Sequence, residues 1–104
     1  MIGAMGRDAQ RFMGHAGVQQ NGCEVLAMLA DDNDENSVAI VAAGGVAAVI
    51  GGMGRFEGHA GVQQDGCMAL RNLALNGKEG RKRINEIGRA SSPLHLTCVF
   101  PHPN

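Results

Sequence analysis

The sequence predicts an all-α fold built from a repeated set of helices. Two stretches 44 residues apart, RFMGHAGVQQNGC at 11–23 and RFEGHAGVQQDGC at 55–67, are identical at eleven of thirteen positions. After each stretch, apolar and small residues recur at the spacing of one face of a helix. A fixed period of roughly 20 to 50 residues is typical of arrays in which successive helical units stack.

Residues 1–8 are expected to form part of a preceding helix, and the first long helix is expected at about 18–30. The apolar and small residues of this long helix form one stripe at helical spacing, made of Val18, Gly22, Val25, Leu26, Leu29 and Ala30. We therefore expect this stripe to be buried.

A turn and two shorter helices are expected between the long helices. The polar run DDNDEN at 31–36 supplies turn and helix-capping side chains, and its acids suit the positive end of a following helix. That helix is expected to begin near residue 35 and to end at the glycine pair 44–45, because glycine accepts the left-handed backbone that closes a helix. A second, apolar helix is expected at 46–53.

The second long helix is expected at 62–75, with an equivalent stripe of Val62, Gly66, Ala69, Leu70, Leu73 and Ala74. The run GRKRINEIGRA at 80–90 corresponds to the first of the shorter helices, so the repeats are expected to span 9–90. The segment 91–104 holds all three prolines and has no helical period. We expect it to be an irregular or disordered tail.

The residues of the repeat resemble the armadillo family. The resemblance covers about residues 9–88 and depends on the 44-residue period, on NSVAIVAAGGV at 36–46 and on VQQDGCMALRNLA at 62–74. It implies a right-handed α-solenoid of three-helix repeats, whose third helices line a groove that holds extended peptides or partner proteins. Such arrays generally need three or more repeats, so this chain is expected to be a short or truncated one.

Composition and charge indicate a globular chain without a general attraction for nucleic acid or membranes. Hydrophobic residues make up 44% of the chain, and the net charge is −1. The N-terminal residues become polar by Arg7, so neither a signal peptide nor a membrane span is expected. The expected location is the cytoplasm, with the nucleus as a further possibility, where cysteines stay reduced.

The repeated histidines and cysteines raise the question of an active site or a zinc site. In each copy, His15 or His59 precedes Cys23 or Cys67 by eight residues. That spacing is about 12 Å along a helix, which is too long for a Cys–His catalytic pair. No C-x-x-C pair is present either. We therefore expect packed thiols and turn histidines, with no enzyme activity, metal or cofactor.

The armadillo resemblance also implies where a partner would bind. In that family an Asn on the third helix holds peptide backbone, and a Trp one turn earlier packs peptide side chains. Asn72, next to Arg71, matches the Asn, whereas Met28 occupies its place in the first copy. Met68 and Glu24 stand where the Trp would be. These five residues are the expected groove for a peptide or protein partner.

An alternative is a structural or self-associating fragment with no groove ligand. Acidic residues lead in the first half of the repeat region, at Glu24, Asp31, Asp32, Asp34, Glu35 and Glu57. Six basic residues lie between 71 and 89: Arg71, Lys78, Arg81, Lys82, Arg83 and Arg89. This asymmetry is typical of a solvated surface, and the alternative that it leaves open is a homo-oligomer in which the basic end of one copy meets the acidic end of another.

Overall fold

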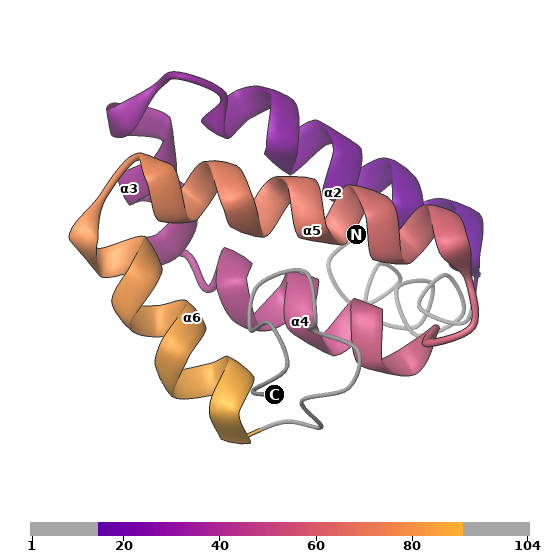
Figure 1. The fold of residues 1–104 in the computed structure, drawn as a ribbon. Coiled ribbons are helices and arrows are strands. Elements are labelled where there is room, and N and C mark those ends of the chain that lie inside the picture. The colour runs from indigo at the N-terminus through magenta and orange to yellow at the C-terminus, as the bar shows by residue number, and fades with distance from the viewer. Residues whose placement is uncertain (1–14, 91–104) are drawn as a thin grey trace, which may run out of the picture.

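The computed structural model describes residues 15–90, and within this range every regular element is an α-helix. The helices are α2 (Ala16–Ala30), α3 (Asp34–Ala42), α4 (Gly45–Arg55), α5 (Ala60–Leu75) and α6 (Lys78–Ala90) (Figure 1). The all-α prediction is therefore confirmed for this part of the chain. The expectations for residues 1–8 and for the tail 91–104 fall outside it.

Local sequence explains where α3 begins and ends. The Asn33 side chain accepts a hydrogen bond of 2.8 Å from the Asn36 backbone N–H, and Asp34 and Glu35 lie in the first turn, near the positive end of the helix. Beyond its C-terminus, Gly44 has a φ of 90°, a left-handed conformation that favours glycine. The predicted capping run and glycine stop are thus confirmed.

The two long helices run side by side and in the same direction (Figure 1). Each begins two residues earlier than predicted, at Ala16 and Ala60, because the residue before it, His15 or His59, is the N-cap. The Asn72 side chain donates a hydrogen bond of 2.8 Å to the Ala27 carbonyl oxygen, and Asn76 donates to that of Ala30. Equivalent turns of the two copies therefore lie next to each other.

The core lies where α5 packs on α4 and α6. Val46, Val49, Ile50 and Met53 of α4 are buried, and so are Val62, Ala69, Leu70 and Leu73 of α5 and Ile84 of α6. The Gln63 side chain fixes the α4–α5 turn, since its amide donates to the carbonyl oxygens of Met53 and Phe56 at 2.8 and 2.9 Å. At the other end of α5, a Cβ on Gly80 would lie 2.2 Å from the Leu73 carbonyl oxygen, so α6 approaches α5 closely there.

The predicted burial of the stripe is confirmed for α5 and is wrong for most of α2. Val18 and Leu29 are 47% and 48% exposed, whereas their equivalents Val62 and Leu73 are fully buried. The buried residues of α2 are Cys23, Ala27 and Ala30, of which only Ala30 belongs to the predicted stripe. The reason is that α4 covers the stripe of α5, while no helix within residues 15–90 takes that place beside α2.

Candidate functional site

An open hollow of about 420 Å³ lies over the contact between α2 and α5. It is lined by Ala27, Met28, Asp31, Met68, Arg71, Asn72 and Leu75. Four of the five residues expected to bind a partner, Met28, Met68, Arg71 and Asn72, are therefore brought together. The fifth, Glu24, is exposed on α2 one turn before Met28 and does not line the hollow. We name this surface, with Glu24 at its edge, the inter-helix groove.

The groove is built from equivalent positions of the two copies. With the shift of 44 residues, Ala27 corresponds to Arg71, Met28 to Asn72 and Asp31 to Leu75. On each helix these positions lie three, four and seven residues after Glu24 or Met68, which is the spacing of a single helical face. All four pairs differ between the copies. The repeat therefore changes its chemistry along this face.

The groove combines exposed apolar side chains with charges of both signs. Met28, Met68 and Leu75 are 69%, 49% and 68% exposed, which is unusual for large apolar residues gathered on one surface. Asp31, the C-cap of α2, and Arg71 on α5 are exposed as well. Methionine is flexible and polarisable, so it adapts to differently shaped partners. The surface is suited to apolar contact with polar groups beside it.

Asn72 has a structural role in addition to the expected binding role. One N–H of its side chain is used by the Ala27 carbonyl oxygen, which fastens α5 to α2. A primary amide has a second N–H and a carbonyl oxygen. Within residues 15–90, no hydrogen bond to the side-chain carbonyl oxygen of Asn72 is present, whereas its backbone carbonyl oxygen accepts from the Asn76 N–H. The side-chain oxygen can accept an N–H from a bound backbone while the amide nitrogen holds the two helices together.

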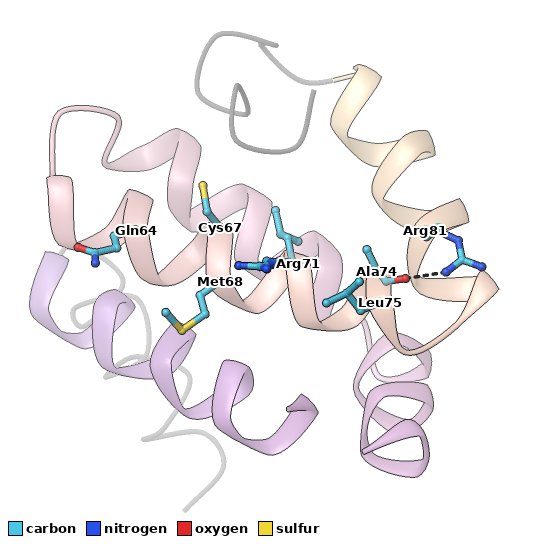
Figure 2. Close-up of a pocket in the computed structure, with 8 residues that line it drawn as sticks. Gln64, Cys67, Met68, Arg71, Ala74, Leu75 and Arg81 are labelled. Carbon is cyan, nitrogen blue, oxygen red and sulfur yellow. Dashed lines mark hydrogen bonds between the residues drawn. The ribbon is translucent and has the colours of Figure 1, made fainter. Parts of the chain in front are cut away.

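A second hollow of about 600 Å³ lies on the side of α5 that faces away from α2, beside the start of α6 (Figure 2). It is lined by Gln64, Cys67, Met68, Leu70, Arg71, Ala74, Leu75 and Arg81. The Arg81 guanidinium donates a hydrogen bond of 2.8 Å to the Ala74 carbonyl oxygen. In Figure 2, Met68 points toward α2 and Cys67 points away from it. Met68, Arg71 and Leu75 line both hollows, so the two lie next to each other on α5.

His15 and His59 are N-cap residues and Cys23 is a buried free thiol, as expected, whereas the expectation of a packed thiol is wrong for Cys67, which is disulfide-bonded. His59 is the N-cap of α5, and its Nδ1 accepts a hydrogen bond of 3.2 Å from the Val62 N–H. Burial raises the pKa of the Cys23 thiol, and the nearby Asp65 carboxylate raises this pKa further. The thiol therefore stays protonated at neutral pH and is a poor nucleophile. Among the described residues, no group of three or more His, Cys, Asp or Glu side chains could hold a metal ion.

Comparisons with protein-family models, with curated proteins and with solved structures give no match for this chain. Within residues 15–90, no single helix has both the length and the hydropathy needed to cross a bilayer. Only α3 and α4 taken together, with a bend of 71° between them, pass that test by length and composition.

Sequence reasoning missed three residues that line the inter-helix groove, Ala27, Asp31 and Leu75. The available signal was the helical face itself, since residues three and seven positions after Glu24 and Met68 lie on the same side of each helix. Comparison with the armadillo Asn and Trp positions drew attention to only two positions per helix. The complete face extends one turn further toward the C-terminal end.

Proposed function

We propose that this chain is a non-enzymatic protein–protein interaction module, built as a short right-handed solenoid of armadillo-like repeats. Its inter-helix groove binds an extended peptide segment of a partner protein. The observation that carries the proposal is the exposure of Met28, Met68 and Leu75 around one hollow, over the contact of the two long helices. Contiguous exposed apolar surface rimmed by polar residues marks interaction sites more often than ordinary protein surface.

The bound segment is an extended peptide with apolar side chains and at least one charge. Its apolar side chains pack on Met28 and Met68, and a backbone N–H donates to the Asn72 carbonyl oxygen. Asp31 attracts a positive group of the peptide, and Arg71 attracts a negative group. Together they favour one direction of the bound peptide. Parallel helices are spaced by about 8 to 10 Å, so two helices contact only a few peptide residues and the affinity is modest.

Replacement of an exposed groove methionine by a charged residue tests this function. A phage-displayed library of random short peptides is selected on the immobilised protein, because multivalent display retains weak binders. The best peptide is then titrated against the 15N-labelled protein by NMR. We expect Met28→Glu and Met68→Glu to weaken binding by about tenfold or more, since each loses apolar contact and adds an unpaired charge. Shift changes in the wild-type protein should concentrate on α2 and α5.

The matched control is Val38→Glu on α3. Val38 is 56% exposed but does not line the inter-helix groove, so the same kind of charge is added to the outside of the fold. Peptide affinity should be unchanged in this variant. If both methionine variants bind as well as wild type, or if Val38→Glu is equally impaired, the peptide site lies elsewhere and the proposal is wrong.

A further inference from the structure

Two equivalent cysteines of the long helices differ in oxidation state. Cys67 of α5 is disulfide-bonded, whereas Cys23 of α2 is a free, buried thiol. The chain holds three cysteines, and the third is Cys98, in segment 91–104 beyond α6 and outside the described residues. Within a single chain, Cys98 is therefore the one cysteine that can pair with Cys67.

We propose that a disulfide between Cys67 and Cys98 fastens segment 91–104 over the 600 Å³ hollow on α5, and that reduction of this bond uncovers the hollow. The occupant of the hollow is thus the C-terminal segment of the same chain. The bond regulates the surface next to the inter-helix groove. Its effect on peptide affinity rests on the proposed function, whereas the disulfide and the covered hollow do not.

The segment is long enough to reach Cys67. Gly80 of α6 lies against Leu73 of α5. From this contact, Cys67 is six residues away along α5 and Ala90 is ten residues away along α6, which is about 9 and 15 Å. α6 also folds back onto α4, so its end lies closer to α5 than the sum of these lengths (Figure 1). Eight steps from Ala90 to Cys98 span up to about 26 Å, and a disulfide adds about 5.5 Å between Cα atoms.

The hollow and the residues around Cys98 have matching chemistry. Cys67 points away from α2, on the side of α5 where the hollow lies (Figure 2). Apolar residues line the hollow beside it: Met68, Leu70, Ala74 and Leu75. The run LHLTCVF at 94–100 places apolar residues on both sides of Cys98. Burial of these residues against the hollow removes apolar surface of both from water, which favours the covered state.

The surroundings of the two helix cysteines explain why the bond forms at Cys67. Cys23 is 3% exposed, whereas Cys67 is half-buried and lines an open hollow that another segment can enter. Burial also raises the pKa of the Cys23 thiol, and the Asp65 carboxylate raises this pKa further. Disulfide exchange needs an accessible thiolate. Cys23 therefore stays reduced and does not compete with Cys67 for Cys98.

The covered hollow adjoins the inter-helix groove. Met68, Arg71 and Leu75 line both, so only the width of α5 separates the two surfaces. With the disulfide formed, a partner has access to the groove alone. When the segment is released, groove and hollow form one continuous surface across α5, and a longer peptide gains apolar contacts on the Cys67 side.

Reduction is a two-electron exchange with a dithiol. A thiolate of the dithiol attacks one sulfur of the protein disulfide and forms a mixed disulfide, and the other protein sulfur leaves as a thiolate. The second thiol of the dithiol then displaces the remaining protein sulfur. Two protein thiols result after protonation, and the dithiol is oxidised to a disulfide.

A peptide map of the full chain tests the pairing. The protein is prepared without reductant, denatured, alkylated and digested with trypsin. We expect 56–71 to be linked to 90–104 and Cys23 to be alkylated in 12–55, with a monomer mass before digestion. Three alkylated cysteines, a bond to Cys23 or a disulfide-linked dimer would overturn the proposal.

The methionine methyl signals test whether the segment covers the hollow. The full chain is labelled with 13C-methyl methionine and compared by NMR with and without a dithiol. The Met68 signal should move on reduction, whereas Met28, which lines the groove but not the hollow, should not move. Cys98→Ser should show the reduced position of Met68 without any reductant. The matched variant Cys23→Ser keeps the bond and should behave as wild type.

A Met68 signal that stays in place on reduction and in Cys98→Ser would show that the segment does not cover the hollow.

Peptide affinity in the two oxidation states tests the regulation. A peptide of about 12 residues, selected from a displayed library on the reduced protein, should bind the oxidised protein about tenfold more weakly, because the contacts in the hollow are blocked. Cys98→Ser should bind it equally with and without a dithiol, and Cys23→Ser should keep the difference. Equal affinity of wild type in both states would contradict the regulation. If no peptide binds in either state, the proposed function fails, whereas the peptide map and the Met68 signal still decide the disulfide and the covered hollow.

Discussion

Ala27 and Ala30 show how single residues join the two long helices. Their small side chains are 1% and 0% exposed, which lets α5 approach the α2 backbone. Their carbonyl oxygens then become acceptors for Asn72 and Asn76, two side chains one turn apart on α5. The two asparagines differ in one respect: Asn72 lines the inter-helix groove, and Asn76 does not. Asn72 thus joins the two helices and also lines the groove, whereas Asn76 only joins the helices.

Replacing each asparagine by alanine separates these roles. Both Asn72→Ala and Asn76→Ala lose a hydrogen bond between α2 and α5, so each should lower the free energy of unfolding by about 1 kcal/mol. Only Asn72→Ala also removes the carbonyl oxygen that faces the groove. It should weaken the selected peptide by about fivefold, an effect of about 1 kcal/mol. Urea unfolding and NMR titration measure the two quantities, and equal peptide affinity in both variants would exclude backbone capture by Asn72.

At the scale of elements, two helices of nearly the same sequence are used differently. Gly66 of α5 allows close packing of α4, because a Cβ there would lie 2.6 Å from the Met53 side chain. Its equivalent in α2, Gly22, has nothing within 4 Å of the same point. The surroundings, rather than the helix sequence, therefore decide whether this glycine is needed.

Equivalent glycine substitutions should have opposite effects on stability. Gly22→Ala removes the conformational freedom of glycine from a helix without a clash, so it should raise the free energy of unfolding by about 0.5 to 1 kcal/mol. Gly66→Ala forces Met53 to move in the packed core, which should cost about 1 to 3 kcal/mol. Chemical unfolding of both variants, followed by circular dichroism, gives the signs. Stabilisation by Gly66→Ala would show that α4 and α5 are less tightly packed than the structure has them.

At the scale of the whole molecule, the sequence was sufficient to predict the helices and turns, but not which helices pack against each apolar stripe. The period of 44 residues predicted five helices in the right places, because caps such as Asn33 and stops such as Gly44 act locally. It predicted equal burial for equivalent stripes, which failed at Val18 and Leu29. Burial depends on the helix that packs opposite, and equivalent residues of two repeats can face different neighbours.

The unequal packing of the long helices predicts unequal protection against hydrogen exchange. α5 packs against α2, α4 and α6, whereas the buried residues of α2 lie on the side that faces α5. In dilute solution, central amides of α5 should exchange at least about tenfold more slowly than those of α2, because local opening of α2 exposes less apolar surface. Exchange followed by mass spectrometry of peptides from 16–30 and 60–75 measures the difference.

The two peptides come from helices of nearly the same sequence, so a difference between them reports the neighbouring helices rather than the helix sequence itself. Equal exchange rates for α2 and α5 would contradict the unequal packing of the two helices.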